Sequence, residues 1–232
     1  MIIGSGLIAH AFRTGYAQRE DVCLYAAGVS NSACRDAHEF ERERQRLSAA
    51  LNKSQAIGCF VYFGTCSVGD PEAQQTPYVQ HKLAMEGLVA AHPRHLILRL
   101  PQVAGITPNP HTLLNFLYAH IARSEAFQLW AKATRNIIDV ADVATIATLL
   151  IDDPSARNLT VNIANPVCYA MPDIVAAMER FVGKKAIYDL IERGSGYQID
   201  ISTIRPLLNR ADVTFGNEYL ARVIGKYYAK SD

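Results

Sequence analysis

The chain has 232 residues, of which 50% are hydrophobic and 19% are charged, and its formal net charge is +1. This size and composition suit one globular domain, or one domain with a small appendage. The near-neutral balance gives no basic surface for nucleic acid, and no apolar stretch approaches the length of a membrane span. We therefore expect neither a nucleic-acid partner nor a membrane partner.

In chain order, the first half of the sequence predicts short strands that alternate with helices. Residues 1–3 are a very short apolar start, followed by a glycine turn. The predicted helices cover 7–17, 36–52 and 78–91, and the predicted strands cover 22–27, 57–64 and 95–100. The clearest strand is Ile57–Gly64 (IGCFVYFG), whose continuous apolar and aromatic run is typical of a parallel strand covered on both faces.

The second half continues the alternation with a weaker pattern after Gly183. The predicted helices cover 112–123, 142–151, 172–182, 202–208 and 217–228, and the predicted strands cover 127–130, 136–140, 159–163 and 186–190. Strands that alternate with helices over most of a chain favour a parallel α/β sheet with right-handed crossovers. We see no internal repeat and no low-complexity linker.

Five cysteines are odd in number and widely spaced, and they form no CxxC pair. This pattern favours neither a zinc site nor a disulfide framework, and it suits a reducing compartment. The N-terminus lacks the basic start and continuous apolar stretch of a signal peptide. We therefore expect a cytoplasmic protein.

The first chemical signal is the run Gly4-Ser5-Gly6-Leu7-Ile8-Ala9, which matches G-x-G-x-x-G/A. Its glycines permit a tight turn and a close approach of backbone to a pyrophosphate, and the following helix N-terminus favours anionic oxygens. An ordinary glycine-bearing turn between a strand and a helix is the alternative, and the motif alone does not choose between them.

The second signal is the pair Tyr78 and Lys82, which project from the same face of a predicted helix. A tyrosine normally ionises near pH ~10, too high for acid–base catalysis at neutral pH, and a nearby ammonium group lowers that pKa. Taken alone, an incidental pair on a surface helix is the favoured interpretation, because this spacing arises often.

The third signal is Thr65, which follows the clearest strand directly. Open α/β sheets bind ligands outside the carboxyl ends of their strands, and a hydroxyl there can hold a substrate oxygen. Ser67 is a nearby competitor for this role, and a simple turn that caps the strand is the alternative for either residue.

The three signals occur in the order glycine turn, strand-end hydroxyl, tyrosine–lysine helix. In this order the sequence resembles the extended short-chain dehydrogenase/reductase family, the nucleotide-sugar epimerases and dehydratases. The resemblance covers about residues 1 to 165. Further stretches similar to segments of that family are Ala26–Ser30 (AAGVS), Phe60–Val68 (FVYFGTCSV), Tyr78–Glu86 (YVQHKLAME), Leu98–Gly105 (LRLPQVAG), Arg135–Ala144 (RNIIDVADVA) and Val161–Ala164 (VNIA).

The resemblance implies a Rossmann-like cofactor-binding and catalytic domain over 1–165 and a small substrate-side region over 166–232. It implies that Tyr78 is the acid–base residue, Lys82 its activator and ribose ligand, and Thr65 the substrate-oxygen anchor. The implied cofactor is NAD or NADP, and the residues expected to bind it are Gly4, Ser5, Gly6, Leu7, Ile8, Ala26, Ala27, Gly28, Lys82 and Pro101. The residues expected to bind substrate are Ser67, Gln102 and Arg135. Family members often dimerise through the helix that carries the tyrosine and lysine, so a homodimer is a further expectation.

Two departures from the family pattern concern the cofactor. The interval Leu7–Tyr25 is too short for the second strand, helix and third strand of the family, and no acidic residue stands near Ala26–Ser32 to hold the adenosine ribose. We therefore expect a sheet that is reduced on its adenosine side. The loop from Thr65 to Tyr78 is also shorter than usual and lacks the family's tyrosine–glycine pair.

Other polar residues receive simpler interpretations. The seven histidines form no metal-ligand spacing, so no metal is expected, and His81 should point away from the Tyr78–Lys82 face. The run Glu39–Arg46 is most simply a solvated helix face. A salt bridge to Asp139 or Asp142 is the structural alternative for Arg135.

The resemblance implies an NAD(P)-dependent epimerase, dehydratase or reductase that acts on a nucleotide-activated sugar, in the synthesis of polysaccharide or surface-glycan precursors. One alternative is a reductase of another small carbonyl compound with the same catalytic residues. Another is a non-catalytic Rossmann-like protein that binds a nucleotide or a partner, which the missing adenosine strands favour and the intact set of Thr65, Tyr78 and Lys82 opposes.

Overall fold

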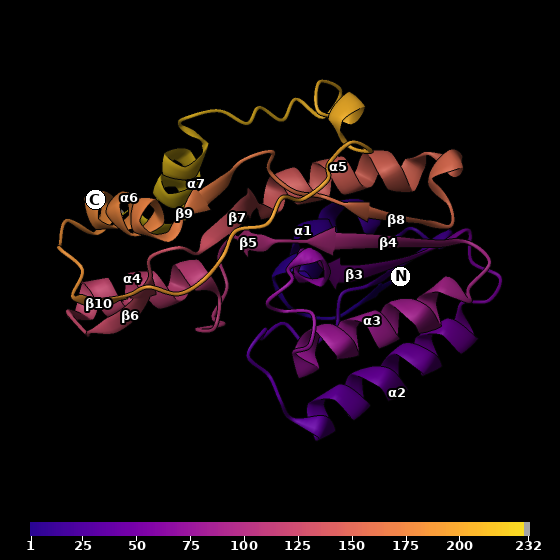
Figure 1. Cartoon of the computed structure of the whole chain (residues 1–232). Helices are drawn as coiled ribbons and strands as arrows, with labels where there is room; N and C mark the ends of the chain where they lie inside the picture. The colour runs from indigo at the N-terminus through magenta and orange to yellow at the C-terminus, as the bar shows by residue number, and fades with distance from the viewer. Residues whose placement is uncertain (230–232) are drawn as a thin grey trace.

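The computed structural model describes residues 1–229 and is built around a five-stranded parallel sheet in the order β1-β2-β3-β4-β8 (Figure 1). The strands are β1 (Ile2–Ile3), β2 (Val22–Tyr25), β3 (Cys59–Thr65), β4 (His95–Leu100) and β8 (Leu159–Asn162). The predicted parallel α/β sheet is confirmed, with the clearest predicted strand at its centre. That strand begins at Cys59 and includes Thr65 as its last residue.

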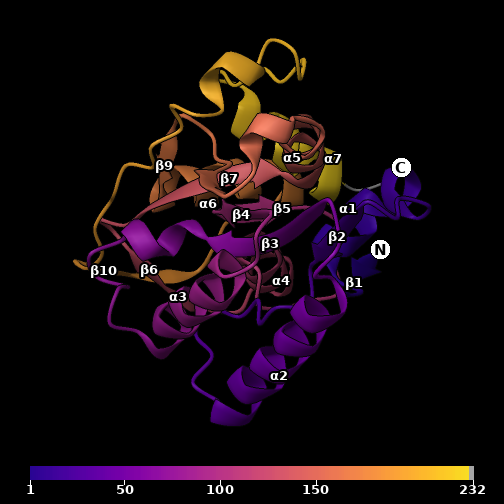
Figure 2. The same ribbon diagram turned by 90° about the vertical axis from the view of Figure 1, so that its right-hand side faces the viewer.

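Both faces of the central sheet are covered by helices. On one face α2 (Ala37–Lys53) and α3 (Pro77–Ala90) pack side by side, and on the other lie α1 (Leu7–Tyr16) and α5 (Val140–Asp152) (Figures 1 and 2). Because side chains alternate along a strand, Phe60 and Tyr62 of β3 join the core under α2 and α3. Val61 and Phe63 join the opposite core with α1 and α5. The continuous apolar run of β3 is explained by this double burial.

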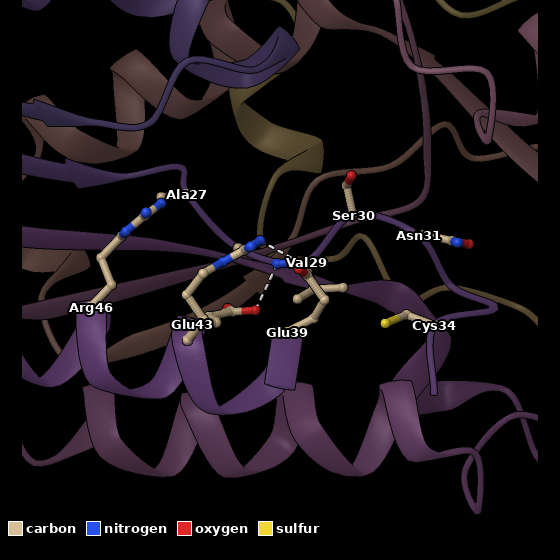
Figure 3. Close-up of a pocket in the computed structure, with 10 residues that line it drawn as sticks. Ala27, Val29, Ser30, Asn31, Cys34, Glu39, Glu43 and Arg46 are labelled. Atoms are coloured by element: carbon tan, nitrogen blue, oxygen red, sulfur yellow. Dashed lines mark hydrogen bonds and ion pairs between the residues drawn. The ribbon is translucent and has the colours of Figure 1, made fainter. Parts of the chain in front are cut away.

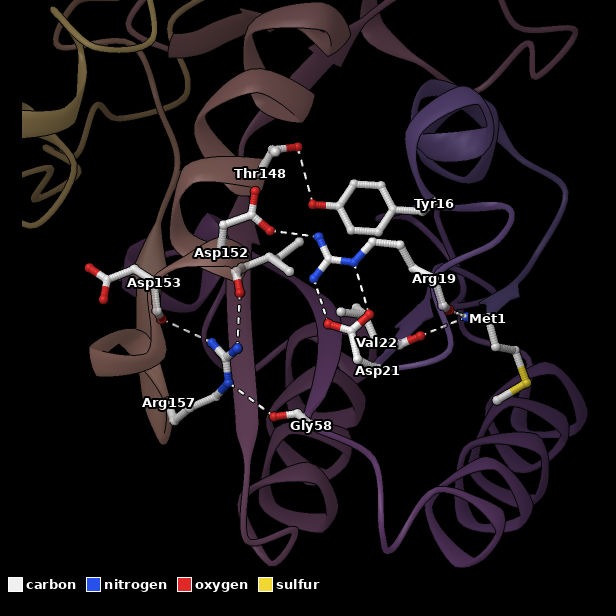
Figure 4. A network of polar contacts seen from close by, with 11 residues as sticks. Met1, Tyr16, Arg19, Asp21, Val22, Gly58, Thr148, Asp152, Asp153 and Arg157 are labelled. Carbon is white, nitrogen blue, oxygen red and sulfur yellow. Dashed lines mark hydrogen bonds and ion pairs between the residues drawn. The ribbon is translucent and has the colours of Figure 1, made fainter.

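The sheet ends at β1, which pairs with β2 alone. The interval Leu7–Tyr25 holds only α1, a turn and β2, so among residues 1–229 no strand pairs with the outer side of β1. At the amino ends of the strands, the Arg19 guanidinium bonds Asp21 and also Asp152 of α5, each at 2.6 Å (Figure 4). This network fastens the turn after α1 to the end of α5, its neighbour on the same face of the sheet.

A second layer of structure lies beyond the carboxyl ends of the central strands (Figure 1). Its strands are β5 (Gln102–Ala104), β6 (Phe127–Trp130), β7 (Thr134–Asp139), β9 (Cys168–Ala170) and β10 (Tyr188–Ile191), and its helices are α4 (Leu113–Arg123), α6 (Met171–Val182) and α7 (Tyr219–Tyr228). β5 and β9 were not predicted, and β9 pairs antiparallel with β7. The core of this layer combines buried residues of 104–137, 171–182 and 219–228, while residues 199–215 pack against the first core. The division at residue 165 stays a prediction.

The helix predicted over 202–208 is wrong. Only one 3₁₀ turn forms, over Arg205–Leu207. Pro206 has no N–H to donate, and it disfavours helical geometry at the residue before it. The segment instead buries Ile201 and Ile204 against the first core.

Tyr219 fastens α7 to the junction of β7 and α5, and the removal of its hydroxyl tests this packing. Its buried hydroxyl accepts the Asp139 backbone N–H at 2.9 Å and donates to the Asp142 carboxylate at 2.6 Å. Tyr219→Phe leaves both partners without a bond, so we expect a loss of about 1–3 kcal/mol in the free energy of unfolding. Thermal denaturation should show a Tm lower by about 2–4 °C for each kcal/mol. Tyr188→Phe, at an exposed tyrosine, should leave the Tm unchanged, and an equal Tm for both variants would contradict this role.

Candidate active site

A cleft of about 920 Å³ opens at the carboxyl ends of the central strands. Its wall includes Thr65, Tyr78 and Lys82 together with every residue expected to bind cofactor, and it includes Ser67 and Gln102. Only Arg135, among the expected site residues, does not line this cleft. The structure therefore brings three separate sequence signals to one place.

The two glycines of the turn after β1 serve different purposes. Gly4 has a φ of +133°, and a Cβ there would lie 2.3 Å from the Ala26 carbonyl oxygen, so this position admits only glycine. Gly6 has ordinary backbone geometry, and a Cβ there would meet no atom within 4 Å. Gly6 lines the cleft and begins α1 with no side-chain cap, so the first-turn N–H groups remain available to an anion.

The charge of the cleft also suits an anionic ligand. None of the residues that line it is Asp or Glu, whereas Lys82 and Arg46 contribute positive charge. Arg46 comes from α2 and was not among the expected site residues. The residues present therefore fit a dinucleotide, whose pyrophosphate would meet the glycine turn, and the nearest carboxylates, Glu39 and Glu43, line the adjoining hollow.

Thr65 lies where β3 ends and a 3₁₀ turn, Cys66–Gly69, begins. Its Oγ1 accepts the Ser67 backbone N–H at 3.1 Å and so caps this turn. The bond uses the oxygen as an acceptor and leaves the hydroxyl proton available for donation. The capping role and the proposed substrate contact are therefore compatible.

Tyr78 lies in the first turn of α3, which begins after Thr76 caps the helix and Pro77 fills its first position. The pKa of Tyr78 is raised to about 12, chiefly by burial; the Thr65 side chain acts in the opposite direction, and the charge of Glu43 adds to the rise. The expectation that Lys82 lowers this pKa is therefore wrong for the protein alone. The reason lies in the partners of Lys82.

The Lys82 ammonium is buried and donates hydrogen bonds to two side chains of the protein. Its Nζ donates to Glu43 Oε1 and to the Tyr62 hydroxyl, both at 3.2 Å, and lies 6.0 Å from the centre of the Tyr78 ring. The carboxylate of Glu43 neutralises the charge that was expected to act on Tyr78. Burial lowers the pKa of Lys82, and Glu43 works against that shift.

Glu43 and His81 were both misjudged from the sequence. Glu43 was assigned to a solvated helix face, yet only 3% of it is exposed. His81 was expected to turn away, yet its Nε2 lies 2.9 Å from Glu43 Oε2 and its ring stacks on Phe40. The signal was available, because Glu43 lies on the same helical stripe as Phe40 and Leu47.

Arg135 lies on β7, where its guanidinium donates to the Thr134 carbonyl at 2.7 Å. The alternative of a structural salt bridge is wrong among residues 1–229, since Asp139 pairs with Lys226 and Asp142 accepts from Tyr219. Its contact with substrate stays a prediction.

The model of the NAD dependent epimerase/dehydratase family matches residues 36–164, which include Thr65, Tyr78 and Lys82 and begin after the glycine turn. No curated protein matches the chain. Within the described part of the chain, no helix is long and apolar enough to cross a membrane.

Solved structures share the fold at low sequence identity. UDP-glucuronic acid 4-epimerase from Bacillus cereus, in complex with UDP-glucuronic acid and NAD, is 18% identical with a TM-score of 0.75, over 90% of this chain and 74% of that one. The Thermus thermophilus UDP-glucose 4-epimerase complex with NAD is 16% identical with a TM-score of 0.71, over 95% and 80%. RMD from Pseudomonas aeruginosa, complexed with NADPH, is 16% identical with a TM-score of 0.71, over 99% and 90%.

Proposed function

The chain belongs to the NAD dependent epimerase/dehydratase family, and from this premise we propose that it transforms a nucleotide-activated sugar with NAD or NADP. The reaction is an epimerisation, dehydration or reduction in the synthesis of a polysaccharide or surface-glycan precursor. One observation carries the proposal: Thr65, Tyr78, Lys82 and the glycine turn line a single cleft.

The cofactor would lie across the carboxyl ends of the strands. The turn Gly4–Gly6 and the N-terminus of α1 would hold its pyrophosphate, and Lys82 would hold its nicotinamide ribose. Ala26–Gly28 and Pro101 would form the wall beside it. When bound, the cofactor supplies the redox chemistry, and the protein supplies position and proton transfer.

Proton transfer falls to Tyr78. With a pKa of about 12, its hydroxyl is protonated at neutral pH and can donate to a substrate oxygen. The Thr65 hydroxyl can donate a hydrogen bond to the same substrate oxygen and hold it in place. Donation by Tyr78 requires a separation of about 2.6–3.2 Å between its hydroxyl oxygen and the substrate oxygen.

The substrate class is supported by the neighbours that share the fold. Two of them are UDP-sugar 4-epimerases by description, and one contains its nucleotide sugar beside NAD. Ser67 and Gln102 line the cleft, where they would contact the sugar, and Arg135 would reach the diphosphate only from the adjoining layer.

A substrate screen tests the proposal. The protein is incubated with UDP-, dTDP- and GDP-linked sugars and either cofactor, and products are separated by chromatography while nicotinamide absorbance is followed. Conversion of a nucleotide sugar is the expected result. Conversion only of free carbonyl compounds would identify a reductase of another substrate, and cofactor binding without any turnover would favour a non-catalytic nucleotide-binding protein.

We expect the cleft to prefer NADPH to NADH. It offers no carboxylate for a ribose 2′-hydroxyl and it presents the Arg46 guanidinium, which suits a 2′-phosphate. One charge-assisted hydrogen bond corresponds to roughly a tenfold difference in affinity. Fluorescence titration should show this ratio in the wild type and its loss in Arg46→Gln.

Arg44→Gln is the matched control, because Arg44 lies on the same helix, pairs with Glu41 and lines neither the cleft nor the hollow beside it. It should keep the wild-type ratio. Equal affinities for the two cofactors in the wild type would refute the preference.

A further inference from the structure

Glu43 is a buried carboxylate in which every acceptor position is used. Its Oε1 accepts from the Tyr62 hydroxyl at 2.9 Å and from Lys82 Nζ at 3.2 Å. Its Oε2 accepts from the Val29 backbone N–H at 2.6 Å and from His81 Nε2 at 2.9 Å. Figure 3 shows the side chain rising from α2 toward Val29. Four donors from three other segments thus converge on one carboxylate.

These contacts keep Glu43 ionised in spite of its burial. Burial alone would raise its pKa, but the hydrogen bond to His81, the charge of Lys82 and the Val29 N–H outweigh it and lower the pKa to about 2. Burial raises the pKa of Tyr62 well above its usual range, and the charge of Glu43 adds to this. Its hydroxyl therefore stays protonated and can donate to Glu43 while it accepts from Lys82.

The geometry leaves Lys82 one free donor. Its ammonium has three N–H groups, of which one meets Glu43 and one meets Tyr62. Within residues 1–229 the third has no acceptor, and Lys82 lines the cofactor cleft. Gly28 makes room for this arrangement, since a Cβ there would lie 2.5 Å from Lys82 Nζ and 2.8 Å from Glu43 Oε1.

We propose that Glu43 is a positioning residue that holds the Lys82 ammonium charged and directed at the cofactor cleft. This inference rests on the function proposed for Lys82. A lysine almost without exposure loses its charge readily unless an opposite charge compensates, and Glu43 is the carboxylate in direct contact with it. The hydrogen bond to the Tyr62 hydroxyl fixes a second N–H of the Lys82 ammonium.

The groups that face the ammonium come from every element packed around it. They are Glu43 from α2, Tyr62 from β3, Tyr78 and Glu86 from α3, and His81 on the far side of Glu43. Glu86 forms its own ion pair with Arg99 at 2.6 Å. The substitution of Glu43 by a neutral residue therefore removes the charge closest to Lys82.

The test follows the titration of Lys82 in the free protein by ¹⁵N NMR of its Nζ, assigned by its loss in Lys82→Met. Opposite charges at this range typically shift a pKa by about 1–3 units. In Glu43→Gln we expect the midpoint for Lys82 to fall by this amount. In Glu43→Asp, which keeps the charge, it should return toward the wild-type value.

Two further measurements separate positioning from general support of the fold. In Glu43→Gln, the affinity for NADPH should fall as the pH rises through the new midpoint, whereas wild-type affinity should persist. Glu41→Gln, at an exposed carboxylate of the same helix that pairs with Arg44, should change neither the midpoint nor the affinity. An unchanged Lys82 midpoint in folded Glu43→Gln would overturn the proposal.

If Glu43→Gln does not fold, Tyr62→Phe carries the test, since it removes one oxygen that accepts from the ammonium. We expect a lower Lys82 midpoint and weaker NADPH binding, and no change in either would overturn the proposal.

The NMR titration needs no cofactor, so its outcome is independent of the proposed function. If the wild type binds NADPH but the Lys82 midpoint does not change in Glu43→Gln, this inference alone is refuted. If the wild type binds no cofactor, the proposed function is refuted.

Discussion

Tyr78→Phe is expected to lower turnover by about 10²–10⁴-fold, the usual contribution of a positioned proton-transfer group. The substitution removes one oxygen and keeps the ring that is buried at the base of the cleft. Its hydroxyl is the protonated group beside Thr65, so its loss leaves no neighbouring acid at the substrate oxygen. Cofactor affinity should change little, because the proposed cofactor contacts come from the glycine turn and Lys82.

Steady-state kinetics on the substrate found by the screen, with NADPH titration in parallel, measure the two effects separately. Tyr188→Phe removes the same oxygen from an exposed tyrosine on β10 and should keep full turnover. Full activity in correctly folded Tyr78→Phe would end this mechanism. A loss of affinity equal to the loss of turnover would assign Tyr78 to binding.

Gly6→Val should weaken cofactor binding by at least about 100-fold, the equivalent of roughly two charge-assisted hydrogen bonds to phosphate oxygens. A Cβ at Gly6 would meet no protein atom within 4 Å, Gly6 lines the cleft, and its backbone is already compatible with valine. The fold should therefore survive while the space for the pyrophosphate is lost.

Gly4→Ala is the informative comparison. Its positive φ and the 2.3 Å approach to the Ala26 oxygen make it a structural position, so this variant should lose stability. Thermal denaturation should show the lower stability of Gly4→Ala, and NADPH titration should show the lower cofactor affinity of Gly6→Val. Unchanged cofactor affinity in folded Gly6→Val would contradict the placement of the pyrophosphate.

The central part of the fold could be predicted because its pattern is local. The apolar run around Phe60 and the alternation of helices and strands depend on neighbouring residues, and each left a clear trace in the sequence. The positions of Thr65 and Tyr78 in one cleft followed from the rule that the carboxyl ends of parallel strands gather at one edge. Each motif alone also fitted an ordinary structural interpretation, and the order of the three motifs along the chain favoured the functional one.

The charges of the site could not be predicted, because they depend on contacts between distant segments. Glu43 lies among glutamates and arginines of alternating sign, and only the packing of α2 against α3 shows which of them is buried. The effect of Lys82 on Tyr78 was misjudged for the same reason. Pro206 prevents a helix over 202–208, although the spacing of the apolar residues there is typical of one.

The most direct test of the central claim is a titration of the wild-type protein with NADPH and NADH, followed by the fluorescence of the reduced nicotinamide. The account predicts one saturable site per chain, with a dissociation constant in the range common for enzyme ligands, roughly 1 μM to 1 mM. Binding should be abolished or greatly weakened in Gly6→Val. The absence of saturable binding of either cofactor to folded wild-type protein would contradict the assignment of this cleft as a nicotinamide cofactor site.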